Sequence, residues 1–109
     1  MIELKTDSYS EVLMGSEIPV FVDFFGESCA ICMELLPGVH EMEKEFEGKV
    51  AFASVDTGAE RKLAMKERVM GLPTMAIYEG GEKKVVEGPK DIKSLDDVRG
   101  FINGYLAGK

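Results

Sequence analysis

The segment Pro19–Phe25 (PVFVDFF) is the feature that most restricts how this chain can fold. Its odd-numbered and even-numbered positions are both apolar, so both faces of a strand formed here would be apolar. Only Asp23 carries a charge. Strands with this pattern occur inside parallel sheets, where helices cover both faces. The segment therefore predicts a central strand of an α/β protein, with one carboxyl group within it.

A helical pattern begins at Cys29, shortly after this predicted strand. Pro37 lies within the pattern and predicts a kink, and Gly48 marks its end. Lys49–Asp56 (KVAFASVD) then predicts a second strand, so that strand, helix and strand form a parallel βαβ unit with a right-handed crossover. The apolar face of the helix comprises Cys32, Leu35, Leu36, Val39, Met42 and Phe46.

The second half of the chain predicts a different strand pairing. Gly71–Gly88 contains two strands around Gly80 and Gly81, a sequence typical of a hairpin turn. A parallel βαβ half joined to an antiparallel half gives an α/β fold with a mixed central sheet, helices on both faces and one domain over residues 1–109. The other expected elements are an edge strand near Ile2–Lys5 and helices at Ser8–Met14, Ala59–Val69 and Ser94–Leu106, the last capped by Ser94.

The charge balance limits the kinds of partner. Thirteen basic against 20 acidic residues give a net charge of -7, whereas proteins that bind nucleic acid carry clustered Lys and Arg. No apolar run approaches the ~20 residues that a membrane-spanning helix needs. The sequence MIELKTDSYSEV shows no export signal. We therefore expect a cytoplasmic protein that binds neither nucleic acid nor membrane, in a compartment where thiols stay reduced.

Cys29 and Cys32 are the only cysteines of the chain. Cys29 falls between the end of a buried strand and the start of a helix, and in open α/β sheets functional sites lie beyond the carboxyl ends of the strands. The free N–H groups and the positive dipole end of a first helical turn stabilise a thiolate. We therefore expect Cys29 to act as the nucleophile. Cys32 lies one turn further along the same helix face, toward the core and close enough for a disulfide.

Other uses of the cysteine pair fit the sequence less well. A structural zinc site needs four ligands, whereas this chain has one cysteine pair and one histidine, so we expect no metal site within a single chain. A disulfide that closes so short a loop restrains little of the unfolded chain. A Cys–His hydrolase needs its histidine within ~3 Å of the thiol, but His40 lies roughly 12 Å beyond Cys32 along the helix axis. A redox couple remains, together with a metal or iron–sulfur site shared between two chains.

Asp23 supports the redox interpretation. A buried acid without a partner is costly, so its pKa should be raised. A carboxyl group below the thiols could pass protons to and from Cys32 during disulfide exchange. The alternative is an edge position at which Asp23 is open to water.

Several motifs together resemble those of the thioredoxin family, over nearly the whole chain. VDFFGESCAIC resembles that family's Val-Asp-Phe-Trp-Ala-x-Trp-Cys-Gly-Pro-Cys, and Gly71–Thr74 (GLPT) resembles its Gly-Ile-Pro-Thr. Pro37 matches the helix-kinking proline of the family, and Gly88 matches a glycine of the substrate groove. The resemblance implies a thioredoxin fold.

The same resemblance implies roles for single residues. Cys29 would be the attacking thiol, Cys32 the resolving thiol and Asp23 the acid that handles protons. The peptide bond between Leu72 and Pro73 would be cis, and these two residues would form the ledge on which a substrate strand pairs. No bound cofactor is implied, because the electrons reside in the thiols.

The sequence departs from the family pattern around the cysteines. The tryptophan before the first cysteine is Ser28 here, the other tryptophan is Phe25, and a lysine that usually pairs with the buried acid is Phe52. The motif is thus an atypical Cys-Ala-Ile-Cys, and RVMGLPTMAIYEGGEK also resembles thioredoxins of anaerobic bacteria. The expected substrate-binding residues are Phe25, Ser28, Ala30, Ile31, Gly71, Leu72, Pro73 and Gly88.

These observations predict a dithiol–disulfide oxidoreductase that reduces protein disulfides as a monomer. Its expected partners are protein disulfides and an external thioredoxin reductase that restores the thiols. Two alternatives remain: a thioredoxin-fold binding module, and a redox partner dedicated to one client enzyme with little general reductase activity.

Overall fold

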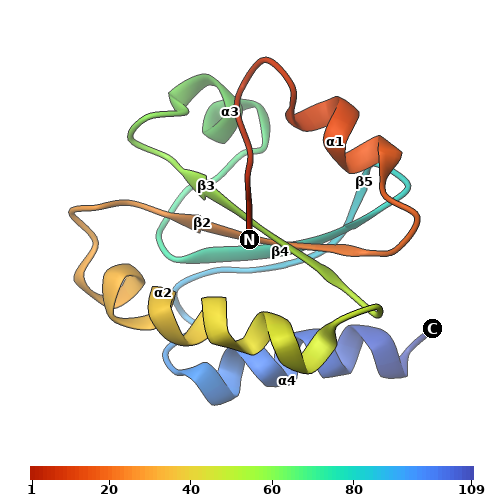
Figure 1. The fold of residues 1–109 in the computed structure, drawn as a ribbon. Helices are drawn as coiled ribbons and strands as arrows, with labels where there is room; N and C mark the ends of the chain where they lie inside the picture. The colour runs from red at the N-terminus through yellow and green to blue at the C-terminus, as the bar shows by residue number, and fades with distance from the viewer.

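The computed structural model describes residues 1–109 and is built around a five-stranded mixed sheet. The central strand β2 (Val20–Phe25) pairs in parallel with β3 (Ala51–Asp56) and antiparallel with β4 (Thr74–Glu79). The short strand β1 (Ile2–Glu3) lies parallel to β3 at one edge, and β5 (Glu82–Glu87) lies antiparallel to β4 at the other. The strand order β1-β3-β2-β4-β5 confirms the expected parallel half and antiparallel half (Figure 1).

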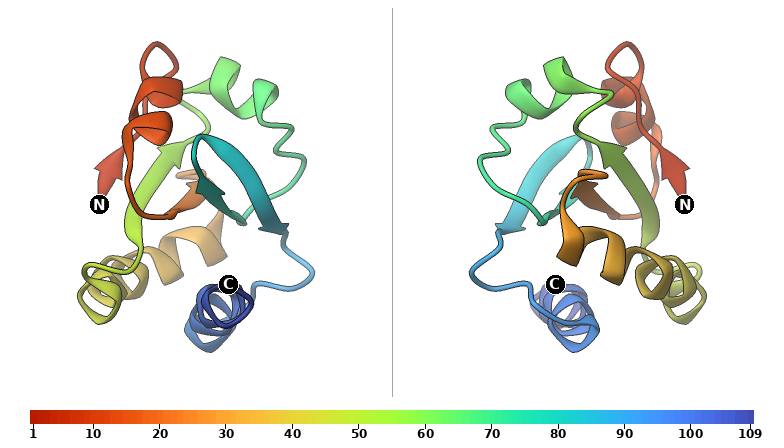
Figure 2. Two further views of the ribbon diagram at one scale, coloured as in Figure 1. Left: turned by 90° about the vertical axis from the view of Figure 1, so that its right-hand side faces the viewer. Right: turned by 90° about the vertical axis from the view of Figure 1, so that its left-hand side faces the viewer.

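Helices cover both faces of this sheet (Figures 1 and 2). The helices α1 (Tyr9–Gly15) and α3 (Arg61–Lys66) lie on one face. The other face carries α2 (Ala30–Met42), the short 3-10 helix η1 (Glu43–Phe46) and α4 (Leu95–Ala107). No helix is long and apolar enough to cross a membrane.

Side chains of β2 alternate between the two hydrophobic cores. Val20, Val22 and Phe24 pack in the core on the α1 and α3 side, whereas Phe21 packs in the core formed with α2 and α4. Because neighbouring side chains of a strand point to opposite faces, Asp23 shares the face of Phe21. The buried carboxyl group therefore faces the side of the sheet that α2 covers.

Phe52 on β3 fills the position at which the family resemblance places a lysine. Its ring centroid lies 4.8 Å from that of Phe21 and 6.1 Å from that of Phe46, and the residue is 1% exposed. An apolar ring therefore occupies this side of the sheet, and no cation reaches Asp23 from residue 52.

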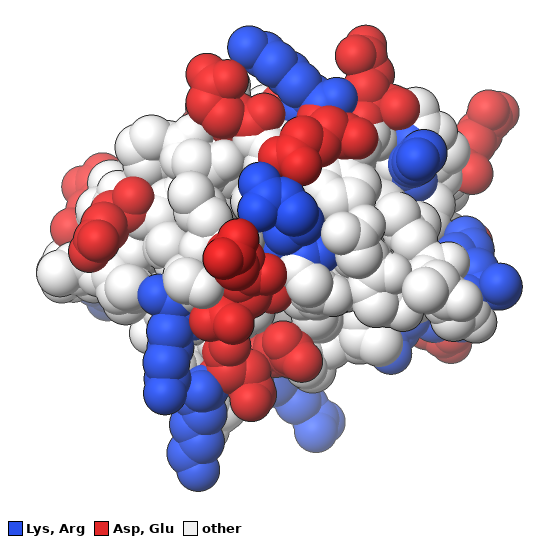
Figure 3. All heavy atoms as spheres, turned by 90° about the horizontal axis from the view of Figure 1, so that it is seen from below, with Lys and Arg blue, Asp and Glu red and all other residues white.

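α4 is held at its start and along its length. The Ser94 hydroxyl accepts a hydrogen bond from the Asp97 N–H at 3.2 Å, which confirms the expected N-cap. Arg99 donates to both carboxylate oxygens of Glu45 on η1, at 3.0 and 2.9 Å. Figure 3 looks onto this side from below and shows acidic and basic side chains interleaved across the middle of the face.

Two helices differ in extent from the sequence expectation. The helix predicted to continue to Phe46 ends at Met42, and the last turn becomes η1.

The helix expected over residues 59–69 is limited to Arg61–Lys66. At its start, the Asp56 carboxylate accepts hydrogen bonds from the N–H groups of Gly58 and Ala59, which hold these residues in a turn. At its end, Arg68 adopts a left-handed conformation with φ of 58°, which terminates the helix.

Glu67 anchors the end of α3 to the sheet. Its carboxylate accepts hydrogen bonds from the hydroxyl groups of Tyr78 on β4 and of Tyr9 on α1, the second at 2.9 Å. Lys83 on β5 donates to the Glu67 carbonyl oxygen and lies 3.9 Å from its carboxylate. Burial and the neighbouring carboxylate raise the pKa of Tyr9 to about 12, so both partners stay neutral donors at ordinary pH. Glu67 thus fixes the start of the segment that leads to Pro73.

We expect Glu67→Gln to lower the free energy of unfolding by about 1–3 kcal/mol, because an amide cannot accept from both hydroxyl groups without facing one with its own donors. Urea denaturation measures this loss. Glu11→Gln, at an exposed residue of α1, is the matched control and should change stability by less than about 0.5 kcal/mol. Equal unfolding midpoints for the two variants would contradict a structural role for Glu67.

Candidate active site

The two cysteines lie at the junction between β2 and α2. Cys29 is the N-cap of α2, and its Sγ accepts a hydrogen bond from the Cys32 N–H at 3.3 Å. The structure joins the two residues in a disulfide with a Cα–Cα distance of 5.3 Å. Cys32 is 1% exposed, whereas Cys29 is half-buried. The pair therefore has one accessible sulfur and one sulfur shielded behind it.

Gly26 allows a second segment to approach the cysteines. A Cβ atom at this position would lie 2.9 Å from the Leu72 Cδ1, closer than real Cβ contacts allow. The absent side chain therefore lets the loop after β2 contact the loop before β4. This contact brings Leu72 beside the segment that carries Cys29.

The loop before β4 carries the cis peptide bond expected between Leu72 and Pro73. The Thr74 hydroxyl donates to the Gly71 carbonyl oxygen and closes the turn. Gly71 also packs near Pro89, because a Cβ added to Gly71 would lie 3.2 Å from the Pro89 Cγ. The segment that begins at Gly88 thus lies against the loop before β4.

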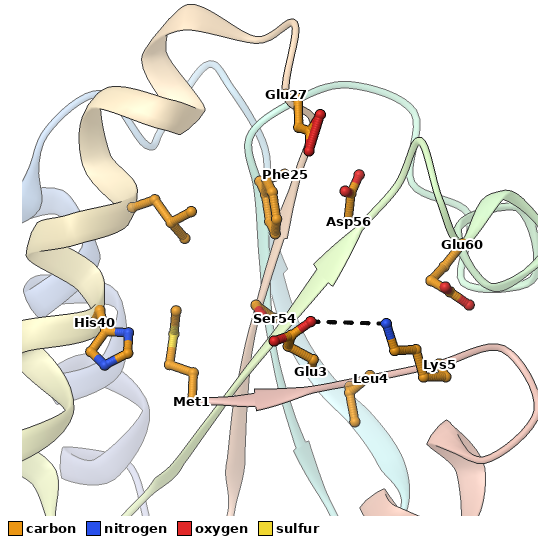
Figure 4. A pocket seen from close by; sticks show the side chains of 11 residues that line it. Met1, Glu3, Leu4, Lys5, Phe25, Glu27, His40, Ser54, Asp56 and Glu60 are labelled. Carbon is orange, nitrogen blue, oxygen red and sulfur yellow. Dashed lines mark ion pairs between the residues drawn. The ribbon is translucent and has the colours of Figure 1, made fainter.

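The expected substrate-binding residues differ in exposure. Ser28 and Ala30 are exposed on either side of Cys29, and Ile31 is half-buried and packs against the core below α2. Phe25 lines a hollow between α2 and the edge of the sheet (Figure 4). The remaining half-buried residues are Gly71, Leu72 and Gly88, whereas Pro73 is buried.

The structure adds two methionines that the sequence interpretation missed. Met33 follows Cys32 directly and is 38% exposed, and Met70 precedes Gly71 and is 92% exposed. Exposed apolar side chains beside a reactive group are typical of surfaces that bind other proteins. Their position next to the two motifs was the signal in the sequence that could have identified them.

Asp23 is 2% exposed and makes no hydrogen bond to another protein group. Across the sheet it is in register with Ser54 on β3 and with Met75 on β4. Burial disfavours the charged carboxylate and raises the pKa of Asp23 from 3.8 to about 7. The structure thus confirms that this acid is buried, and its environment favours the neutral carboxyl group. No group of three or more His, Cys, Asp or Glu is arranged to hold a metal ion.

A disulfide between Cys29 and Cys32 at the start of a helix, on this mixed sheet, defines a class: the thiol–disulfide oxidoreductases of thioredoxin fold. A thioredoxin structure from Plasmodium falciparum has a TM-score of 0.86, covering 96% of this chain and 99% of that one at 23% identity. Thioredoxin f2 of Chlamydomonas reinhardtii has a TM-score of 0.85, covering 96% and 95% at 21% identity. These structures show the fold.

The family follows from sequence comparison. The profile described as Thioredoxin matches residues 1–100. A thioredoxin of Acetoanaerobium sticklandii is 41% identical over 107 residues, which cover 97% of this chain and 100% of that protein. A thioredoxin of Peptoclostridium acidaminophilum is 35% identical over 106 residues, covering 97% and 96%. The chain belongs to the thioredoxin family and is a protein disulfide oxidoreductase.

Burial of Asp23 predicts how stability depends on pH. The folded state keeps the carboxyl proton up to about pH 7, whereas the unfolded state loses it near pH 3.8. The folded state therefore binds more protons in this window, so the free energy of unfolding falls as the pH rises through it and levels off above it. We expect Asp23→Asn to be more stable than the wild type above pH 7, by up to about 4 kcal/mol.

Urea denaturation of the oxidised protein at roughly pH 4 and pH 8 measures this effect. The stability difference between wild type and Asp23→Asn should be large at the higher pH and should vanish at the lower one. Asp7→Asn, at an exposed position, is the control and should show no such pH dependence. An unchanged difference at the two pH values would place the Asp23 carboxyl in contact with bulk water.

Proposed function

We propose that the reduced protein donates two electrons to protein disulfides through Cys29 and Cys32. The Cys29 thiolate attacks a client disulfide, a Cys29–client bond forms, and one client sulfur leaves as a thiolate that takes a proton from water. Cys32 then attacks the Sγ of Cys29, the second client sulfur leaves, and the Cys29–Cys32 disulfide forms. The observation that carries this proposal is the pairing of a half-buried Cys29 with a buried Cys32 one turn behind it.

Asp23 is proposed to take the proton that Cys32 loses as it attacks. The carboxyl group lies on the face of β2 that α2 covers, and its pKa of about 7 is suited to accept and release a proton near neutral pH. Its proton then passes to solvent before the next reduction.

The groove for the client is proposed to run along Leu72 and Pro73. The backbone N–H and C=O groups of Leu72 have no backbone partner, and Pro73 has no N–H to offer. An extended client segment could pair with the free groups of Leu72 as an added strand does. The residues beside this ledge would then contact the client: Phe25, Ser28, Ala30, Ile31, Gly71 and Gly88.

Several further properties belong to the same proposal. The protein acts as a single domain over residues 1–109, as a monomer in the cytoplasm, and without a bound cofactor. An external thioredoxin reductase returns the Cys29–Cys32 disulfide to the dithiol. The close similarity in length to bacterial thioredoxins supports one domain of this kind.

Variants of the two cysteines test the proposed roles. Reduced Cys29→Ser should lose insulin disulfide reduction entirely, because the attacking sulfur is gone. Cys32→Ser should still attack but should remain bound to its client, because the resolving sulfur is gone. Mass spectrometry identifies the trapped clients. Turnover by Cys29→Ser at the wild-type rate would exclude the redox function, and a single trapped enzyme would favour the dedicated redox partner over a general reductase.

Met70 provides a test of client binding that is separate from the chemistry. We expect Met70→Gln to raise the KM for insulin about 3–10-fold, because an apolar contact of order 1 kcal/mol is lost. The rate with glutathione disulfide, which lacks the extended chain of a protein client, should stay unchanged. Met14→Gln is the matched control, since Met14 is 67% exposed beside Gly81, at the opposite end of β4 from Pro73. An equal KM for both variants would show that clients do not contact Met70.

A further inference from the structure

A polar hollow of about 360 Å³ lies between α2 and the edge of the sheet formed by β1 and β3, and Ser54 is one of the residues that line it (Figure 4). It is bounded by Leu36 and His40 of α2 on one side and by β1 and β3 on the other. Ser54 lies at the centre of this view, between Phe25 and Glu3. The hollow is open to solvent and has no role in the thiol chemistry described above.

Ser54 connects this hollow with Asp23. The two residues are direct partners in the parallel register of β2 and β3, so their side chains leave the same face of the sheet on strands ~4.8 Å apart. The partner of Asp23 on the other side is Met75, which offers no strong polar group. Ser54 is therefore the polar cross-strand neighbour of the carboxyl.

Neither side chain is satisfied by the protein. Ser54 is 7% exposed and Asp23 2%, and neither forms a side-chain hydrogen bond to another residue. Every fully buried side-chain nitrogen or oxygen in the structure has a partner. The oxygens of Ser54 and Asp23 must therefore each retain contact with solvent-accessible space. Polar sites with room for a water molecule and several polar partners hold ordered water.

We propose that Ser54 is a positioning residue whose hydroxyl holds water from the hollow against the Asp23 carboxyl and gives that group its route for proton exchange with solvent. A hydroxyl suits this task because it can donate to one water molecule and accept from another at the same time. The inference rests on the proposed function, in which Asp23 takes the Cys32 proton.

The proton balance of the step is complete. Cys32 loses its proton to the Asp23 carboxylate as its sulfur bonds to Cys29, and the client sulfur leaves with the electron pair of the broken bond. Protonated Asp23 then gives its proton to water held by Ser54, and the proton leaves through the hollow. No further oxidant or reductant takes part in this transfer.

The charged groups around the route favour a departing proton. The titratable side chains that line the hollow are four acids, one lysine and one histidine: Glu3, Glu27, Asp56, Glu60, Lys5 and His40. Met1 lines it as well, and its N-terminal ammonium group lies 3.0 Å from the Glu43 carboxylate. Lys5 lies 3.8 Å from Glu3, and the Glu60 carboxylate accepts from the N–H and hydroxyl groups of Thr6. β4 presents Met75 to Asp23, and β3 presents Ser54. The surplus of acids favours a cation in the hollow.

The test compares Ser54→Ala, Ser54→Thr and the double variant Asp23→Asn/Ser54→Ala, with Ser10→Ala on exposed α1 as the matched control. Two readouts are measured between roughly pH 5 and 9: the rate of insulin reduction by the pre-reduced protein, and the titration of the Asp23 carboxyl carbon by NMR. Loss of the hydroxyl and its water should destabilise the carboxylate. Ser54→Ala should therefore move both midpoints upward by about 0.5–1 pH unit.

Ser54→Thr and Ser10→Ala should keep the wild-type midpoints, because the first restores a hydroxyl and the second lies far from Asp23. In the Asp23→Asn background, Ser54→Ala should cause no further change, which shows that Ser54 acts through Asp23. Unchanged midpoints for Ser54→Ala would overturn the proposal, as would an equal loss for the Ala and Thr variants at every pH. A wild type that fails to reduce insulin would instead contradict the proposed function, while the NMR titration would still test Ser54.

Discussion

The burial of β2 on both faces is the constraint on which the rest of the molecule depends. A strand without a solvent face needs a partner strand on each side and helices above and below, and β3, β4 and the two helix layers supply them. The same burial sets the position of the site, because the chain leaves the sheet at Phe25 and enters α2 four residues later at Cys29. The reactive sulfur thus lies at the edge of a rigid core rather than on a long loop.

Asp23 is the one charged residue of this buried strand, and burial of its carboxylate is unfavourable. Its ionisation above pH 7 costs up to about 4 kcal/mol, whereas complete burial of one aromatic side chain such as Phe21 contributes roughly 1.5–3 kcal/mol. Two well-packed aromatic residues are therefore needed to offset one acid. Phe21 and Phe52 lie on the same face of the sheet, in contact with each other. The replacement of a cation by Phe52 thus leaves the carboxyl without an opposite charge but adds to the core that tolerates it.

Local patterns were sufficient to predict the elements that carry the site. The apolar run of β2, the helical repeat after Cys29, the Ser94 cap and the turn at Gly80 and Gly81 each have a local physical cause, and the structure confirms them. The predicted extent of α3 was wrong at both ends. The Asp56 turn shortens α3 at its start, and hydrogen bonds from two other elements hold Glu67 at its end. The Asp56 turn is local and has a signal in the Asp56-Thr57-Gly58 sequence, whereas the contacts of Glu67 with Tyr9 and Tyr78 do not follow from the sequence around Glu67.

The pairing of residues across neighbouring strands also could not be predicted from local sequence patterns. Asp23 stood out in the sequence because it interrupts an apolar run, but nothing local paired it with Ser54, which lies 31 positions further along the chain in an ordinary strand. The position of the loop before β4 likewise depends on distant residues, since Gly26 lies against Leu72 and Gly71 against Pro89. Sequence patterns therefore identified the groups proposed to carry the chemistry, whereas the residues around them became visible only when the strands were placed side by side.

The difference in burial between the two sulfurs explains why an acid below them is useful. Cys29 lies at the surface and can meet a client, but Cys32 is 1% exposed and has no direct access to water. Apolar surroundings favour a neutral thiol, so Cys32 tends to keep its proton until the mixed disulfide brings an electrophilic sulfur within reach. At that moment the proton must move to a group that is equally buried. In the proposed mechanism Asp23 meets this requirement, because the desolvation that makes it costly to the fold also raises its pKa to about 7.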